Sequence, residues 1–222
     1  TALAPPSGSR AQVPSTTPTT DVGDVRVTRH LPEGGLDPLV QAGHTLIQNK
    51  RDDRYSPEEL AELAPEVDGI LCLLTDRIDE TVLRAGAAGR LKVIGNAAVG
   101  YDNVDLTAAR SSGIAVCNTP GVLDKTTADL AFLLILTASR LASDAEQDLR
   151  AGRWGGWGFM DYLSRDVYGG VLGLVGYGRI AREVARRAEG FEMEVLHHSR
   201  TDTGLPGYVA ELDELLAAAD VV

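Results

Sequence analysis

Hydrophobic and polar positions along this chain alternate between two kinds of segment. Short apolar runs, typical of strands buried on both faces, are separated by stretches in which apolar residues recur at helical spacing. The clearest strand is Gly69 to Leu74, with the sequence GILCLL, and the clearest helix start is Ser56 to Glu59, where a serine cap precedes a proline. Strands that alternate with helices predict a parallel sheet with helices on both sides.

Between Val25 and residue 120 this alternation predicts one α/β domain. The expected strands are Val25 to Thr28, Thr45 to Gln48, Gly69 to Leu74, Lys92 to Gly95 and Ile114 to Cys117. The expected helices are Gly35 to Ala42, one that starts at Pro57, one from Asp79 to Ala85, and Val104 to Ser111. Residues 1–24 are rich in Pro, Ser, Thr and Ala and lack the regions of a signal peptide, so a disordered tail is expected there.

A linker and a long helix follow this domain. Thr119-Pro120-Gly121 interrupts the pattern, as a linker does. We expect a single helix over 126–151, and because Leu130 to Leu136 is apolar all round, this helix should be buried between two domains or two subunits. The segment Trp154 to Phe159 holds both tryptophans and predicts either an interface or site lid, or a loop folded back on the core.

A glycine turn dominates the rest of the chain. The apolar run Val171 to Val175 leads directly into Gly176-Tyr177-Gly178-Arg179-Ile180-Ala181, a G-x-G-x-x-A pattern that opens a helix and is followed by a second strand, Met193 to His198. This order predicts the first half of a dinucleotide-binding unit, in which Gly178 lets the backbone approach a pyrophosphate and free amides at the helix start face the phosphates. The alternative is a plain strand-turn-helix corner. A helix from Leu212 to Ala219 and a third strand beginning at Asp220 come last.

The end of the second strand predicts which dinucleotide binds. NAD sites usually have Asp or Glu at this position, whereas this strand ends in Ser199-Arg200-Thr201. A guanidinium and two hydroxyls suit a 2′-phosphate, so the sequence predicts NADP(H) in preference to NAD(H), with NAD(H) possible. The alternative is that Arg200 is a solvated surface charge. His197 and His198 are expected to be structural, one pointing inward and one outward.

Composition and charge limit the classes of partner that the protein is expected to bind. A formal charge of -11 disfavours a nucleic-acid-binding surface, which needs a basic stripe. Cys72 and Cys117 each lie in an apolar run, which suggests no disulfide framework and no thiolate metal site, and is typical of a reduced cytoplasmic protein. No apolar stretch reaches the length of a membrane span, so neither nucleic acid nor membrane is an expected partner.

Together these motifs resemble the D-2-hydroxyacid dehydrogenases, and within that family the glyoxylate/hydroxypyruvate reductases. The resemblance extends from about Val25 to Val222, and its most specific segments are Lys92 to Asp105, Asn118 to Leu123, Thr127 to Asp129, the glycine turn and Ser199 to Thr201. It implies two doubly wound parallel-sheet domains: a flavodoxin-like substrate-binding domain over 25–120 and a Rossmann NAD(P)-binding domain over 121–222. The second domain is expected to be incomplete in this chain.

The resemblance also implies site residues. Val99 and Gly100 would offer backbone amides to the substrate carboxylate, and Thr127 would lie near the nicotinamide. Gly176, Tyr177, Gly178, Arg179, Ile180, Ser199, Arg200 and Thr201 would contact the cofactor. The implied reaction is hydride transfer between NADPH and a small 2-keto acid, in a homodimer formed through the long helix and the tryptophan segment. From the residues alone, Gly100 only serves a turn, Asp102 caps a helix and Thr127 starts one.

One departure limits the resemblance. The family's catalytic histidine, the carboxylate that tunes it and the arginine that polarises the substrate carbonyl match no residue of this sequence; His30, His44, His197 and His198 do not fit that histidine. No catalytic residue is therefore assigned, and we expect no turnover from these 222 residues alone. Other dehydrogenases of the same architecture, for phosphoglycerate, formate or phosphonate, stay open, as does a corepressor-like protein that binds the dinucleotide without catalysis.

Overall fold

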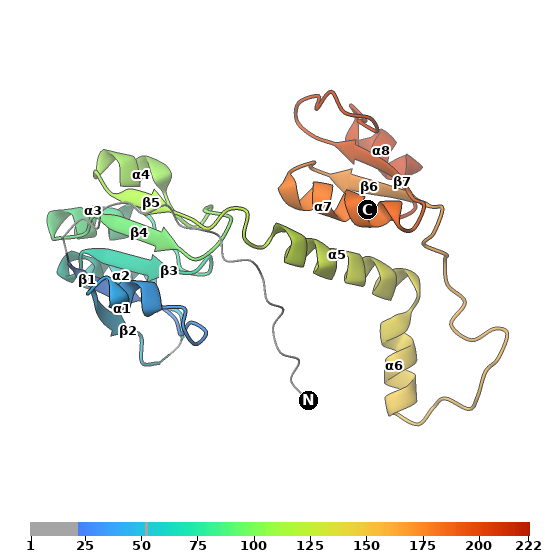
Figure 1. Cartoon of the computed structure of the whole chain (residues 1–222), viewed down its shortest axis with the longest axis horizontal. Coiled ribbons are helices and arrows are strands. Elements are labelled where there is room, and N and C mark those ends of the chain that lie inside the picture. Colours follow the sequence, from blue (N-terminus) through green and yellow to red (C-terminus); the bar gives the residue numbers. More distant parts are fainter. Residues whose placement is uncertain (1–21, 52) are drawn as a thin grey trace. The chain divides into compact units, whose positions relative to one another are not determined.

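The fold is described from a computed structural model over residues 22–51 and 53–222. The expected tail, residues 1–24, lies almost wholly outside the described residues. The chain divides into two compact units, of which the first ends at Thr119 and the second begins at Pro120 (Figure 1).

A parallel sheet of five strands, in the order β2-β1-β3-β4-β5, forms the centre of the first unit. The strands are β1 (Asp24–Val27), β2 (Thr45–Gln48), β3 (Gly69–Cys72), β4 (Val93–Asn96) and β5 (Ala115–Cys117). All neighbouring pairs run parallel, which confirms the α/β class predicted from the alternating pattern.

Helices connect these strands. They are α1 (Asp37–Gln41), α2 (Pro57–Leu63), α3 (Glu80–Ala88) and α4 (Leu106–Ser111), with a short 3₁₀ turn η1 (Ala64–Glu66) after α2. The connection from β1 to β2 runs along the sheet in one direction, and the later connections run in the other. Because such crossovers are right-handed, α1 covers one face of the sheet and α2, α3 and α4 cover the opposite face. The main core lies under α2–α4 and includes Leu60, Ile70, Val82, Leu83 and Ile94.

Local signals set the helix starts as predicted. Ser56 Oγ accepts a hydrogen bond from the Glu59 N–H at 3.2 Å, and the Glu59 carboxylate accepts one from the Ser56 N–H at 2.8 Å, which is a complete capping box. Asp79 caps α3 by accepting from the N–H groups of Thr81 and Val82. Both caps satisfy amides that the first helical turn leaves unpaired.

Most boundaries in the first unit differ from the prediction by one to three residues, and two of these differences have a clear local cause. The strand expected over Gly69 to Leu74 stops at Cys72, because the buried Asp76 carboxylate accepts from the Leu73 N–H at 2.9 Å and turns the chain away from the sheet. Helix α4 begins at Leu106, two residues later than expected. Its cap is Asp105, whose Oδ1 accepts from the Ala108 N–H at 2.9 Å, and the prediction that Asp102 caps this helix is wrong.

The second unit contains a smaller parallel arrangement. It consists of β6 (Val171–Val175), α7 (Arg179–Glu189), β7 (Glu194–His198) and α8 (Leu212–Ala218), with β6 paired to β7. Val221 forms a parallel bridge to Leu172, as expected for a third strand that begins near Asp220. The core lies where α5 (Asp124–Ser139) packs on α7, and it includes Phe132 against Phe191 with ring centroids 4.9 Å apart.

The helix predicted over 126–151 is two helices. Helix α5 ends at Ser139, and α6 (Ala142–Arg150) follows after a bend of 71° at Leu141, whose φ is +51°. One face of α5, which includes Ala128, Phe132 and Ile135, lies in the core with α7, whereas α6 is polar and forms ion pairs of its own, such as Arg150 with Glu146.

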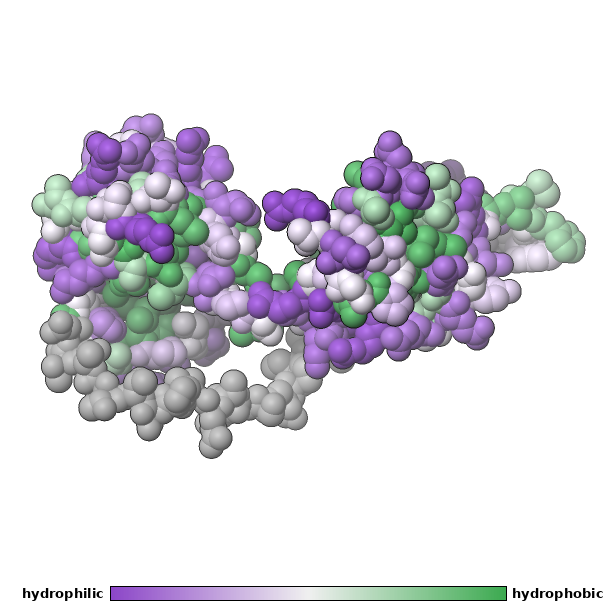
Figure 2. Space-filling view, turned by 90° about the horizontal axis from the view of Figure 1, so that it is seen from above, coloured by the Kyte–Doolittle hydropathy of each residue, from purple (hydrophilic) through white to green (hydrophobic). Residues whose placement is uncertain are grey.

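Apolar side chains of the second unit face outward at two places. Leu130, Leu133 and Leu134 of α5 are 56 to 58% exposed, so burial of this helix between two domains or two subunits stays a prediction. In the segment 154–163, Trp157, Phe159 and Met160 are more than three-quarters exposed, which excludes a loop folded back on the core. Figure 2 shows hydrophobic residues at the projecting end of the second unit.

No single helix among the described residues is both long and apolar enough to cross a membrane. Helices α5 and α6 reach that length and composition only as a pair, across the bend at Leu141.

Candidate functional site

The glycine turn between β6 and α7 leaves open space above its backbone. Gly176 adopts a φ of +90°, and its N–H donates to the His198 carbonyl at 2.7 Å. Gly178 is the cap residue of α7, and no side chain caps the helix there. A Cβ added to either glycine would meet no atom within 4 Å. A ligand can therefore approach the backbone here as closely as glycine permits.

The start of α7 can bind an anion. The N–H groups of Gly178, Arg179 and Ile180 have no hydrogen-bond partner among the described residues, and the helix continues for 11 residues. Free amides at the positive end of a helix dipole favour phosphate. This arrangement fits the pyrophosphate of a dinucleotide, and the assignment of Gly176, Tyr177 and Gly178 to cofactor binding stays a prediction.

The side chain of Arg179 is directed elsewhere. Its Nε lies 3.3 Å from Oδ2 of Asp124, the first residue of α5. The other oxygen of Asp124 is buried and without a partner among the described residues. Thr127 lies one helical turn further along α5, where its N–H already donates to the Leu123 carbonyl at 2.9 Å. Leu123 is the cap residue of α5, so the prediction that Thr127 starts the helix is wrong.

The loop that follows β7 lies beside the glycine turn, because Val175 and His198 pair at the ends of β6 and β7. Ser199 Oγ donates to the Thr201 carbonyl at 2.7 Å, and the Gly204 N–H donates to the Asp202 carboxylate at 2.8 Å. Arg200 is exposed and forms no ion pair or hydrogen bond with any residue that the structure describes. Its guanidinium is therefore available to an anionic ligand, while one oxygen of Asp202 is occupied by the loop itself.

The two histidines at the end of β7 alternate as predicted. His197 is fully buried, and His198 is partly exposed with Nδ1 3.1 Å from the Val209 carbonyl. Burial lowers the pKa of the His197 imidazole below its ordinary value, and the positive charge of Arg182 lowers it further.

In the first unit, three asparagines shape the loop after β4. The buried Asn96 donates from Nδ2 to the Gly100 carbonyl at 2.8 Å, and Asn118, just after β5, donates to the Val99 carbonyl at 2.8 Å. Asn103 donates to the Leu73 and Asp76 carbonyls and forms reciprocal amide bonds with Asn96. We call these three residues the asparagine clamp. It joins the carboxyl ends of β3, β4 and β5.

The asparagine clamp leaves the donors of the loop free. It occupies the carbonyls of Val99 and Gly100, whereas their N–H groups have no partner among the described residues. Gly100 is exposed and Val99 is partly exposed. Two consecutive free amides at the carboxyl end of a parallel sheet can bind a carboxylate. The clamp itself was missed by the sequence reasoning, although asparagines directly after two predicted strands were a usable signal.

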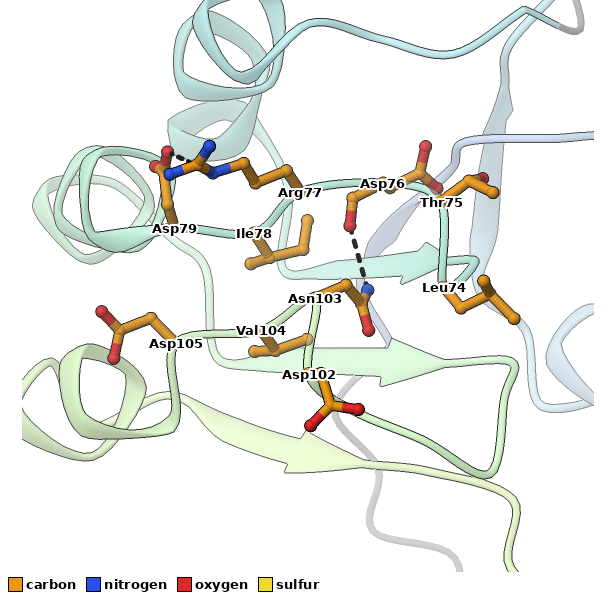
Figure 3. A pocket seen from close by; sticks show the side chains of 10 residues that line it. All are labelled: Leu74, Thr75, Asp76, Arg77, Ile78, Asp79, Asp102, Asn103, Val104 and Asp105. Carbon is orange, nitrogen blue, oxygen red and sulfur yellow. Dashed lines mark hydrogen bonds and ion pairs between the residues drawn. The ribbon is translucent and has the colours of Figure 1, made fainter.

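A pocket of about 460 Å³ adjoins this loop. It lies between the segments 74–79 and 102–105, where the Asn103 amide points at the backbone of Asp76 (Figure 3). Val99 and Gly100 do not line this pocket. Within the part of the chain that the structure describes, no group of three or more His, Cys, Asp or Glu residues could hold a metal ion.

Known proteins are similar to this chain in sequence. The family model for the D-isomer specific 2-hydroxyacid dehydrogenase, catalytic domain, matches residues 25–212. A glyoxylate reductase of Thermococcus onnurineus is 39% identical over 208 residues, which are 89% of this chain and 61% of that protein. A glyoxylate reductase of Korarchaeum cryptofilum is 43% identical over 78% of this chain and 52% of its own length.

Solved structures are similar to this chain in fold as well. A protein of Thermus thermophilus superimposes with a TM-score of 0.80 at 40% identity, over 89% of this chain and 63% of that one. A glyoxylate reductase from Paecilomyes thermophila gives a TM-score of 0.74 at 30% identity, over 90% and 63%. The chain thus spans about three-fifths of the length of the relatives it matches. It belongs to the D-isomer specific 2-hydroxyacid dehydrogenase family.

Proposed function

We propose that the whole protein is an NAD(P)-dependent 2-hydroxyacid oxidoreductase that acts on a small 2-keto acid, with glyoxylate or hydroxypyruvate as the favoured substrates. The bound nicotinamide supplies or accepts the hydride. The observation that carries the proposal is the pair of free amides at Val99 and Gly100, because a carboxylate is the group that every 2-keto acid presents. The relatives named glyoxylate reductase support this choice of substrate.

In this proposal the first unit binds the substrate. The N–H groups of Val99 and Gly100 donate to its carboxylate. Asn118 holds the peptide that carries the Gly100 N–H by donating to the Val99 carbonyl, and the Thr119 N–H holds the peptide that carries the Val99 N–H by donating to the Ala98 carbonyl at 2.9 Å. Preoriented donors bind a charged group at less entropic cost than mobile side chains do. We therefore assign residues 25–120 as substrate-binding and residues 121–222 as part of the dinucleotide-binding domain.

The second unit orients the cofactor. The amides of Gly178, Arg179 and Ile180 bind the pyrophosphate, with Gly176 and Tyr177 forming the turn, and Thr127 lies toward the nicotinamide end. Ser199, Arg200 and Thr201 bind a 2′-phosphate, which favours NADP(H) over NAD(H). A charge-assisted hydrogen bond contributes about 1.5 to 3 kcal/mol, or roughly one to two decades of cofactor preference.

We further propose a homodimer in which the exposed leucines of α5 and the segment 154–163 form the contact. Trp157 and Phe159 already stack edge to face, with centroids 4.5 Å apart, and offer the aromatic surface that interfaces favour. Light scattering of the whole protein tests this, and a monomeric mass would contradict it. The free thiols of Cys72 and Cys117 are compatible with a reducing compartment, and we propose a cytoplasmic location on that ground.

The experiment follows cofactor oxidation by the whole protein with glyoxylate, hydroxypyruvate and other 2-keto acids, and compares two variants. Asn118→Ala releases the Val99 carbonyl, so KM for the keto acid should rise roughly tenfold while the NADPH Kd stays unchanged. Gly178→Ala places a methyl group over the turn, so the NADPH Kd should rise while stability is kept. NADPH binding without turnover on any 2-keto acid would refute the oxidoreductase and favour the corepressor-like alternative.

A related expectation concerns these 222 residues by themselves. They contain no histidine that fits the family's proton donor, so we propose that this length of chain binds dinucleotide without turnover. Measurable glyoxylate reduction by the purified 222-residue chain would refute that.

A further inference from the structure

An aromatic column stands behind the glycine turn. The ring of Tyr177, the residue between the two glycines, stacks on His197 of β7 with centroids 3.9 Å apart and planes 18° apart. Tyr208 packs on His197 at 5.8 Å and 57°. The Arg182 guanidinium of α7 lies 5.6 Å from the Tyr177 ring centroid, and its Nε donates to the Tyr177 carbonyl at 3.3 Å. The column thus ties the turn, α7 and β7 together.

His197 also holds the loop that follows β7 at three points. Its backbone N–H donates to the Gly207 carbonyl at 2.7 Å, and its carbonyl accepts from the Val209 N–H at 2.8 Å. The chain therefore leaves β7 at Ser199, and the returning segment, Gly207 to Val209, pairs with His197. Within this excursion, His197 Nε2 lies 2.7 Å from Thr203 Oγ1, a hydrogen bond in which either group can be the donor.

Thr203 transmits this contact to the part of the loop that would meet the cofactor. Its Oγ1 also accepts from the Leu205 N–H at 3.3 Å, so the hydroxyl fixes the loop two residues beyond Thr201. The remaining ring nitrogen of His197, Nδ1, is buried without a partner among the described residues. A fully buried imidazole with one unsatisfied nitrogen costs stability, and its single side-chain hydrogen bond goes to this loop.

We infer that His197 is a positioning residue for cofactor choice: through Thr203 it holds the loop that carries Ser199, Arg200 and Thr201 in the geometry that receives a 2′-phosphate. The inference rests on the proposed function. Arg200 forms no ion pair or hydrogen bond with any described residue, so its placement depends on the loop backbone. The glycine turn, by contrast, is fixed by the ring stack and does not require the hydroxyl.

The charged groups around the imidazole are consistent with this role. Arg182 on α7 faces the column and lowers the pKa of His197 in addition to burial, while Asp202 in the loop opposes that shift. The lowered pKa favours the neutral ring, which can share one hydrogen bond with a hydroxyl while it stacks on Tyr177.

The test measures Kd for NADPH and NADH on the whole protein with Thr203→Val and the matched control Thr203→Ser. Valine keeps the size of threonine and removes the hydroxyl, so Kd for NADPH should rise roughly three- to tenfold while Kd for NADH changes less than about twofold. Serine keeps the hydroxyl and should retain the wild-type preference. In an Arg200→Ala background, Thr203→Val should have a smaller effect on the Kd for NADPH than it has alone, because the hydroxyl acts in part through the placement of Arg200.

His197→Phe keeps the stack and removes the hydrogen bond, so it is an independent test. It should raise the Kd for NADPH relative to that for NADH as Thr203→Val does. An equal loss of affinity for both cofactors, or an unchanged ratio of the two Kd values, would overturn the positioning role. A wild-type protein that prefers NADH would instead contradict the proposed cofactor choice, and one that binds neither dinucleotide would overturn both.

Discussion

The two units use their apolar residues differently. Among the described residues, fifteen buried ones form a core between the sheet and α2–α4 in the first unit, whereas the corresponding core of the second contains seven. The second unit instead exposes three leucines of α5 and the aromatic segment 154–163. An apolar pattern in the sequence therefore predicts that the apolar face is buried. It does not identify the element that buries this face, which differs between the two units.

The same contrast extends to the candidate site. The first unit prepares its ligand donors by hydrogen bonds to the carbonyls of the loop, from the Asn118 side chain to Val99 and from the Thr119 N–H to Ala98. The second prepares its donors by backbone conformation, through the positive φ of Gly176 and the uncapped start of α7. A mutation should thus act through lost hydrogen bonds in one unit and through backbone strain in the other.

The largest expected effect compares one substitution in both units. Leu83 of α3 is fully buried and Leu133 of α5 is 56% exposed. Leu83→Ala should lower the free energy of unfolding by about 2 to 5 kcal/mol, because it opens a cavity in a closed core. Leu133→Ala should change it by less than about 0.5 kcal/mol at concentrations where the protein is monomeric. Denaturant titration of the whole protein measures both, and equal losses would show that the α5 face is covered.

A smaller difference is expected between two glycines of the candidate site. Gly176→Ala forces a residue with a Cβ to a φ of +90°, which costs about 1 to 2 kcal/mol. Gly100 lacks a positive φ, and an added Cβ would meet only Asp102 Oδ2 at an ordinary 3.7 Å. Gly100→Ala should therefore leave the melting temperature nearly unchanged. A lower melting temperature for Gly100→Ala than for Gly176→Ala would contradict the contrast between the two loops.

A pH dependence of stability should distinguish the second unit. Burial lowers the pKa of His197 in the folded state below the ordinary value of 6.5, so the unfolded chain binds the proton more readily. The stability contribution is complete above about pH 6.5 and is lost as the pH falls below that value. Thermal unfolding between neutral and mildly acidic pH should show this loss, and His197→Phe should reduce it. An unchanged slope in His197→Phe would exclude His197 as its source.

The smallest expected effect concerns the reactivity of the two cysteines and leaves stability unchanged. It tests whether the core of the first unit is closed to a thiol reagent. Cys72 is buried, and desolvation together with the charge of Asp76 raises the pKa of its thiol to about 12. Cys117 is exposed. A maleimide should label Cys117 within minutes and Cys72 only after denaturation, since the thiolate is the reactive form. Labelling of Cys72 in the folded protein, followed by mass spectrometry, would show that the core opens locally.

Sequence patterns predicted most of the fold because local and global preferences agree. The capping box at Ser56, the cap at Asp79 and the glycine turn at Gly176 are signals that a few neighbouring residues determine. The bend at Leu141 could not be predicted in this way. No glycine or proline marks it, and it arises where packing against α7 ends, which is a property of the folded unit.

The candidate site shows a similar limit. The turn and its open backbone followed from residue types, whereas the asparagine clamp joins three strand ends that are distant in sequence. Asn96 and Asn118 meet the same loop only because β4 and β5 are neighbours in the sheet. The column through Tyr177 and His197 likewise required the register of β6 and β7.

The asparagine clamp has a consequence for regulation by pH. Carboxamides and backbone amides neither gain nor lose a proton near neutral pH, so the geometry of the Val99–Gly100 peptides is the same in mildly acidic and in mildly alkaline solution. A carboxylate bound there would accept hydrogen bonds from amide groups that do not titrate in this pH range. Any acid limb in substrate affinity of the whole protein should accordingly originate in groups other than these amides.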